Sequence, residues 1–97
     1  MADQTNAAQY QTEEDLRKAV RAIIIELAPE PDGQSAPEGR LVDDLGYHSL
    51  ALLELAFALE DEFDLQPIDE PTARRITTLM DVENHVVSEF RSTGRLT

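Results

Sequence analysis

The apolar residues between positions 16 and 27 recur at helical spacing, and this periodicity limits the possible folds more than any other feature. They fall at offsets of 0, 3, 4, 7, 8 and 11 residues, so they share one face of an α-helix. Thr12 is a candidate N-cap, and acidic residues at 13–15 suit the positive end of a helix. Pro29 and Pro31 end the pattern. The predicted helix buries Leu16, Ala19, Val20, Ile23, Ile24 and Leu27.

The same spacing returns in the second half of the chain. A helix is predicted from Ser49 to about Phe63, and a last helix follows a cap at Thr77 or Thr78. Residues 73–76 can form one further helical turn. Because no segment alternates as a strand does, we predict an all-α four-helix bundle with three main helices and one short helix. The core residues expected from these helices are Leu52, Leu55, Ala56, Leu59, Phe63, Leu79, Val82, Val86 and Phe90.

The length of 97 residues, without internal repeats, predicts one domain over residues 12–90. Residues 1–11 are polar and lack periodicity, so we predict a disordered leader there, and a flexible tail at 91–97. The connection from residue 28 to 47 contains six Pro or Gly residues and is long for a compact domain, which favours a functional role. Leu41, Val42 and Leu45 are expected to pin its second half to the core.

The charge balance narrows the class of partner. Twenty carboxylates against eight Lys and Arg give a net charge of −12, which disfavours nucleic acids and anionic membranes. It favours proteins with basic surfaces, although solubility alone would also account for it. The chain has no Cys, so disulfides, thiolate metal sites and Cys nucleophiles are excluded. No apolar run approaches the roughly 20 residues of a membrane helix, and the polar start is unlike a signal peptide, so we expect a cytoplasmic protein.

The most informative motif is Asp-Leu-Gly-Tyr-His-Ser-Leu at residues 44–50. It resembles the signature of the acyl carrier protein family, in which Asp-Leu-Gly, a variable residue and Asp-Ser-Leu stand at the start of the second helix. Residues 58–63 and 73–79 are also similar to that family, so the resemblance covers roughly residues 12–90 in order. It implies a non-catalytic carrier in which Ser49 bears a covalent 4′-phosphopantetheine taken from coenzyme A. Gly46, His48 and Leu50 would surround the attachment point.

The chemistry of a helix start suits this role independently of the resemblance. As an N-cap, Ser49 would present its hydroxyl beside free backbone N–H groups and the positive end of the helix dipole, where a phosphodiester is stabilised. Gly46 would allow a tight turn just before it. An ordinary capping serine is the alternative interpretation of Ser49 taken alone.

His48 departs from the family signature, which usually has Asp at this position. A histidine there resembles the peptidyl carrier domains of nonribosomal synthetases and some carriers of specialised metabolism. The resemblance therefore favours a discrete carrier in polyketide or hybrid polyketide–peptide biosynthesis. A carrier for fatty acid synthesis and a peptidyl carrier loaded with an amino acid are the alternatives.

A second apolar row on the helix that begins at Ser49 predicts a binding face. Its members are rotated away from the core stripe, which indicates either deep burial or exposure for binding. Residues 42–73 contain nine carboxylates and no Lys or Arg, a charge pattern that favours binding of basic partners. An ordinary solvent-exposed helix face is the alternative interpretation of these carboxylates. The resemblance implies that this face of a monomeric carrier meets a phosphopantetheinyl transferase and acyltransferases, ketosynthases or other enzymes with basic docking surfaces. The implied contact residues are Asp44, Leu50, Leu53, Glu54, Phe57, Glu60, Asp61 and Ile76.

Other functions are less well supported. Asp44, His48 and Ser49 are the residue types of a hydrolytic triad, but neighbours at one loop–helix junction point in different directions, and a Gly-x-Ser-x-Gly elbow is missing. The acidic residues at 61–64 lack the glycine of a calcium loop, so no metal site is predicted. A generic acidic adaptor would gain no mass with coenzyme A and a transferase. Arg17 and Arg21 are expected to pair with nearby acids, and His85 to lie at the surface or its boundary.

Overall fold

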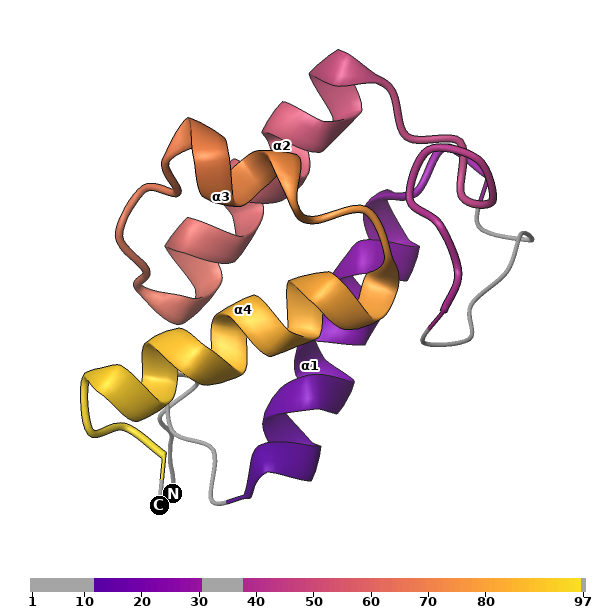
Figure 1. Cartoon of the computed structure of the whole chain (residues 1–97). Coiled ribbons are helices and arrows are strands. Elements are labelled where there is room, and N and C mark those ends of the chain that lie inside the picture. The colour runs from indigo at the N-terminus through magenta and orange to yellow at the C-terminus, as the bar shows by residue number, and fades with distance from the viewer. Residues whose placement is uncertain (1–11, 31–37, 97) are drawn as a thin grey trace.

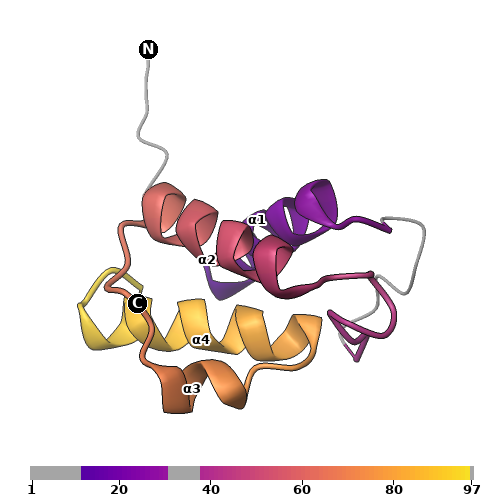
Figure 2. The ribbon, with the colours of Figure 1, turned by 90° about the horizontal axis from the view of Figure 1, so that it is seen from above.

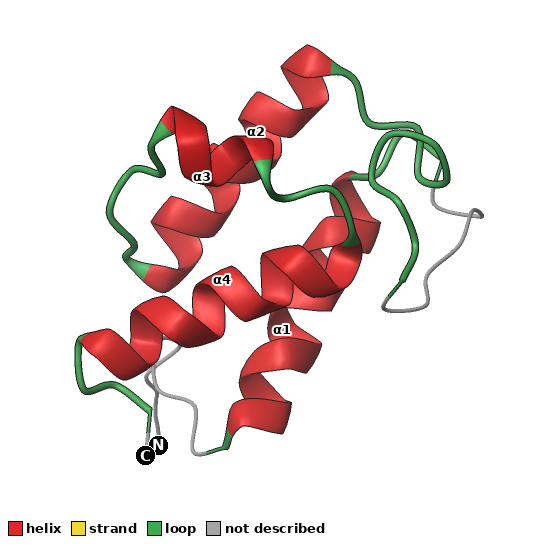
Figure 3. Cartoon of the chain, viewed as in Figure 1, coloured by secondary structure: helices red, strands yellow, loops and turns green. Residues whose placement is uncertain are grey.

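The computed structural model describes residues 12–30 and 38–96, and the leader predicted at residues 1–11 lies outside them. Within these two ranges the chain forms four helices and no strand, which confirms the all-α prediction. α1 packs against both α2 and α4. Figures 1 and 2 show the short α3 on the side of the bundle away from α1. The helices are α1 (Glu13–Leu27), α2 (Ser49–Phe63), α3 (Glu70–Arg74) and α4 (Leu79–Ser92), as Figure 3 shows in red.

The starts of α1 and α4 follow the capping signals in the sequence. Thr12 Oγ1 accepts the backbone N–H of Asp15 at 3.0 Å, and Thr78 Oγ1 accepts that of Asp81 at 3.1 Å. The Asp81 carboxylate in turn accepts the backbone N–H of Thr78, which completes a capping box. The caps predicted at Thr12 and Thr78 are confirmed.

α3 begins earlier than the helical turn predicted at residues 73–76. The Asp69 carboxylate accepts the backbone N–H of Thr72 at 2.9 Å and caps the helix, and Pro71 stands in the first turn, where its missing N–H is tolerated. No residue of α3 is buried. Because apolar periodicity marks only helices with a buried face, the sequence pattern missed this start.

The core consists largely of the faces that periodicity predicted, with some differences. Ala19 and Ile23 on α1 are only partly buried and pack against the core from its edge. Leu27, at the end of α1, is 39% exposed rather than buried. On α2, Ala51 is buried, whereas Leu52 and Ala56 are only partly buried and border a cavity. The predicted core residues that the structure buries are Leu16, Val20, Ile24, Leu55, Leu59, Phe63, Leu79, Val82, Val86 and Phe90.

A network of ion pairs joins α1 to α4. Glu83 is only 2% exposed, and its carboxylate accepts from Arg21 at 2.8 Å and from Arg17 at 3.3 Å. Glu13 accepts from Arg17 at 2.8 Å and also pairs with Arg91. The predicted pairing of Arg17 and Arg21 with acids is confirmed. Glu83 is thus buried as a paired charge, which is the form in which burial is tolerated.

The residues after α4 pack against the bundle. Arg95 donates to the Phe63 carbonyl at 2.6 Å, and its guanidinium lies 4.1 Å from the centre of the Phe90 ring. Leu96 is buried. α4 ends at Ser92, two residues beyond the expected domain boundary at residue 90, and Arg95 and Leu96 contact the rest of the bundle.

Candidate functional site

The loop before α2 is fastened to the bundle by buried side chains. Leu41 and Leu45 are buried as predicted, but Val42, predicted to pin the loop as well, is 56% exposed. Tyr47 takes this role, since it is buried and its hydroxyl donates to the Ile24 carbonyl at 2.6 Å. Burial raises the pKa of Tyr47 to about 12, so the hydroxyl keeps its proton at neutral pH. This anchor is not predicted from the sequence, although Tyr47 is the only aromatic residue between positions 28 and 48.

Two residues shape the turn that leads into α2. The Asp44 carboxylate accepts the backbone N–H of Arg40 at 2.7 Å and closes the turn over residues 40–44. Gly46 has a φ of +77°, in the region that favours glycine, and a Cβ there would lie 2.8 Å from Cγ of Glu30. Gly46 therefore makes a tight turn, and Asp44, expected to contact partners, is engaged within the loop.

The N-cap of α2 is His48, which corrects the prediction that Ser49 caps the helix. His48 Nδ1 accepts the backbone N–H of Ala51 at 3.4 Å, so the imidazole proton is on Nε2 in this arrangement. Ser49 is the first residue inside the helix and is exposed. Its hydroxyl makes no hydrogen bond to any residue that the structure describes. Because His48 does the capping, the serine oxygen is available for reaction.

The second apolar row of α2 lies at the surface. Leu50, Leu53 and Phe57 are 60%, 50% and 58% exposed, and we call these three residues the apolar row. Glu54 and Asp61 are also exposed on this helix. The alternative of core packing is therefore wrong for the apolar row. A run of exposed apolar side chains on one helix is typical of a contact surface.

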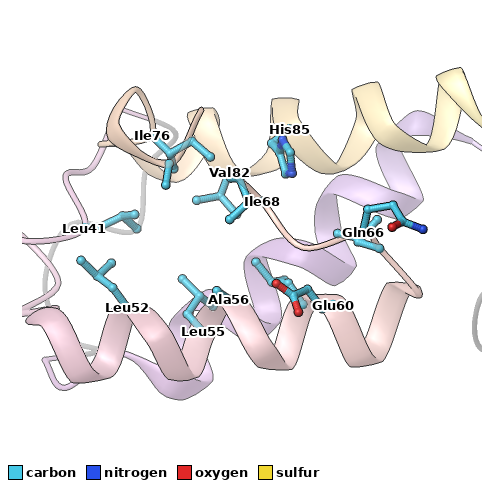
Figure 4. Close-up of a pocket in the computed structure, with 13 residues that line it drawn as sticks. Leu41, Leu52, Leu55, Ala56, Glu60, Gln66, Ile68, Ile76, Val82 and His85 are labelled. Atoms are coloured by element: carbon cyan, nitrogen blue, oxygen red, sulfur yellow. The ribbon is translucent and has the colours of Figure 1, made fainter. Parts of the chain in front are cut away.

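A cavity of about 170 Å³ separates α2 from α3 and α4 (Figure 4). Its wall is mostly apolar, but Glu60 from α2 and His85 from α4 also line it, as does Ile76 just after α3. Glu60 and Ile76, both expected on the partner face, are partly buried and border this cavity. His85 is likewise partly buried, which fits the expected boundary position. The remaining lining residues are Leu41, Leu52, Leu55, Ala56, Leu59, Leu65, Gln66, Ile68, Ala73 and Val82.

The residue types of a hydrolytic triad are present but are used otherwise. The Asp44 carboxylate is bonded to the Arg40 backbone and His48 Nδ1 to the Ala51 backbone, and no bond among the described residues joins either side chain to Ser49. In residues 12–30 and 38–96, no group of three His, Cys, Asp or Glu side chains is arranged to hold a metal ion. The same residues include no helix that is both long and apolar enough to cross a membrane.

Comparison with known proteins gives a consistent result. The family described as the phosphopantetheine attachment site matches residues 18–86. An acyl carrier protein of Bdellovibrio bacteriovorus is 43% identical over 68 residues, which cover 69% of this chain and 85% of that protein. The range matched by the family includes α2, the loop before it, Ser49 and the cavity-lining residues from Leu41 to His85.

Proposed function

The chain belongs to the acyl carrier protein family, and from this premise we propose that Ser49 carries the 4′-phosphopantetheine arm. Proteins of this family are non-catalytic carriers whose domain bears that group covalently. The observation that supports Ser49 is its exposed hydroxyl at the first position of α2, within the matched range and outside the helix cap. When attached, the arm supplies the thiol on which an acyl group is carried.

The residues around Ser49 fit a phosphodiester. The first turns of α1, α3 and α4 contain acidic side chains, whereas the first turn of α2 contains none. Acidic groups at a helix start balance the positive end of its dipole, and a phosphate on Ser49 would supply that charge to α2. The backbone N–H groups of Ser49 and Leu50, which have no partner within the helix, would be its donors. The loop contacts of Asp44 and Tyr47 would hold this position in place.

The test is modification of the intact chain. With coenzyme A and a broad-specificity phosphopantetheinyl transferase, the wild-type protein should gain the mass of one arm, and Ser49→Ala should gain none. Ser88→Ala is the matched control, since Ser88 is an exposed helical serine on α4. A modified Ser49→Ala protein would refute the site.

The proposed partner face consists of the apolar row together with Glu54 and Asp61. Exposed apolar side chains beside carboxylates suit cytoplasmic transferases, acyltransferases and ketosynthases with basic docking surfaces, because complementary charge speeds association while leaving the complex reversible. Glu54→Lys should slow modification at low salt, and the difference from wild type should shrink as salt screens the charge. Glu26→Lys, an exposed acid on α1, is the control. Equal slowing by both variants would assign the effect to net charge rather than to this face.

The finer part of the proposal is that the carrier serves polyketide or hybrid polyketide–peptide biosynthesis. Its support is His48, which caps α2 where the family signature has Asp. Since Asp also caps helices, His48→Asp should keep the helix start and raise the rate of modification by a transferase of fatty acid synthesis. Equal rates would remove His48 as a selectivity residue, and an ordinary saturated fatty acyl group on the purified protein would favour fatty acid synthesis.

A further inference from the structure

The last turn of α1 leaves one buried carbonyl without its usual helical partner. In a continuous helix the N–H of Ala28 would donate to the carbonyl of Ile24, but it donates to that of Ile25 at 3.3 Å instead. Ile24 is 0% exposed, so water does not reach its carbonyl. The Tyr47 hydroxyl donates to this carbonyl at 2.6 Å and is itself buried. Tyr47 therefore satisfies the end of α1 from a different part of the chain.

The backbone of Tyr47 is also tied to the rest of the bundle. Its N–H donates to the Leu41 carbonyl at 2.9 Å, and the Leu41 N–H donates to the Thr77 carbonyl at 3.0 Å, just before α4. Tyr47 thus connects the end of α1, the loop and the start of α4. His48 follows directly and caps α2, so the position of Ser49 depends on how firmly Tyr47 is held.

The Tyr47 hydroxyl makes the least replaceable of the side-chain hydrogen bonds near Ser49. The His48 cap is long, at 3.4 Å, and the bond of the Asp44 carboxylate lies at the surface, where water can take its place. The bond to Ile24 is buried, so loss of the hydroxyl would leave the carbonyl without any partner. A phenylalanine at position 47 would fill the same space but could not make this bond.

This bond lies apart from the surface that is proposed to meet partners. Tyr47 is buried, whereas the apolar row is at least half exposed along α2. Loss of the hydroxyl should therefore leave the contact surface unchanged and alter the alignment of the Ser49 oxygen within the bound complex. Alignment of reacting atoms governs the rate at which the bond forms rather than the affinity of the two proteins.

We propose that Tyr47 is a positioning residue for the modification of Ser49, because its bond to the end of α1 fixes the start of α2. In that reaction the serine oxygen bonds to the phosphorus that bears the pantetheine, and the phosphoanhydride bond of coenzyme A breaks. Adenosine 3′,5′-bisphosphate leaves, and the serine proton passes to a base of the transferase. This inference rests on the proposed function and goes further by assigning a kinetic role to a buried residue outside the partner face.

The test is the single-turnover rate of modification of the intact chain, with coenzyme A saturating and a phosphopantetheinyl transferase in varied excess. For Tyr47→Phe, the maximal rate should fall about threefold to thirtyfold, while the transferase concentration at half the maximal rate changes less than about twofold. Leu53→Ala, in the apolar row, should show the opposite pattern. Val86→Ala, at a position that is 0% exposed on α4, controls for lost stability and should be modified at the wild-type rate.

A second measurement follows the start of α2 without any transferase. In NMR spectra of the unmodified chain, Tyr47→Phe should shift the amide signals of His48 and Ser49, and Val86→Ala should leave them in place. Circular dichroism first verifies that each variant is folded. If Tyr47→Phe unfolds in buffer, all proteins are compared in sucrose, which favours the compact state.

The possible outcomes separate this inference from the proposed function. Equal maximal rates for Tyr47→Phe and wild type, or a loss seen only in the half-saturating concentration, would overturn the inference. Unshifted amide signals at the start of α2, or an equal slowing of Val86→Ala, would also overturn it. A wild-type chain that stays unmodified while the same transferase modifies a control carrier protein would instead refute the proposed function, and this inference with it.

Discussion

The α1–α4 side of the molecule and the α2–α3 side use the same kinds of residue in opposite ways. Between α1 and α4 most core side chains, such as Leu16, Val20 and Val86, are 0% exposed, and the buried carboxylate of Glu83 is paired with two arginines. On α2 the apolar row is at least half exposed, and Glu54 and Asp61 have no ion pair within residues 12–30 and 38–96. Beside them, α3 buries no residue and borders a cavity.

This difference indicates that stability and function are assigned to separate parts of a small domain. Buried, paired groups stabilise the fold, whereas exposed apolar groups and a cavity contribute little to stability, and the exposed apolar groups suit the contacts with other molecules that we propose for them. Substitutions on the α1–α4 side should therefore change stability, and substitutions on the outer face of α2 should change partner binding.

The largest effect should come from a matched pair of leucines. Leu16→Ala, at a position that is 0% exposed on α1, should lower the free energy of unfolding by about 2–5 kcal/mol. Leu53→Ala, at a half-exposed position on α2, should change it by less than about 0.5 kcal/mol. Urea denaturation measures both. Similar losses would mean that the apolar row supports the fold after all.

The second effect compares a buried ion pair with a surface one. Glu83→Gln leaves Arg17 and Arg21 without their shared charged partner, so the free energy of unfolding should fall by about 2 kcal/mol. Glu14→Gln removes an exposed pair with Lys18 at 3.9 Å and should cost at most about 0.5 kcal/mol. Equal stabilities of the two variants in urea would show that the network between α1 and α4 is dispensable.

The third effect concerns the turn before α2. Gly46 and Gly94 both have positive φ, +77° and +76°, but only at Gly46 would a Cβ meet a neighbouring side chain. Gly94→Ala should therefore cost about 1 kcal/mol for backbone strain alone, and Gly46→Ala about 1–2 kcal/mol because Glu30 must also move. Thermal unfolding distinguishes the two. If Gly94→Ala proved the more destabilising, contact with Glu30 would have no part in the turn.

The smallest effect is a dependence of stability on pH at the start of α4. Burial tends to raise the pKa of Asp81, but hydrogen bonds from Thr77 and Thr78 outweigh it and hold the pKa below the ordinary 3.8. Asp81 therefore stabilises the fold above pH 3.8, and this contribution is lost as the pH falls through its lower folded pKa. Asp81→Asn should lower stability at neutral pH by about 0.5–1 kcal/mol and flatten the loss toward acid. A parallel pH profile for both proteins would contradict this role.

Much of the α1–α4 side could be predicted from the sequence, because periodicity reports which face of a helix is buried. The caps at Thr12 and Thr78 follow from local chemistry. Four of the buried residues of α4, namely Leu79, Val82, Val86 and Phe90, follow from spacing, whereas Val87 does not. The pairing of Arg17 and Arg21 with acids was also predictable, although the identity of their buried partner, Glu83, depends on how α1 and α4 cross.

The α2–α3 side was predicted less well, for three physical reasons. A stripe cannot tell close packing from a cavity wall, so Leu52 and Ala56 were assigned to the core. Histidine is an uncommon helix cap, so the cap was assigned to Ser49 instead of His48. The loop has no apolar periodicity, so its pattern gives no sign that Tyr47 anchors it. The anchor depends on the Ile24 carbonyl, which is 23 residues away in sequence.

The most direct test of the account locates the arm within the modified chain. Cleavage after Arg40 and Arg74 releases residues 41–74, in which Ser49 is the only serine. After incubation with coenzyme A and a transferase, this peptide should carry the added mass, and its fragmentation should locate that mass on Ser49. Added mass on another residue would contradict the account. So would a 41–74 peptide that stays unmodified while the same transferase modifies a control carrier protein.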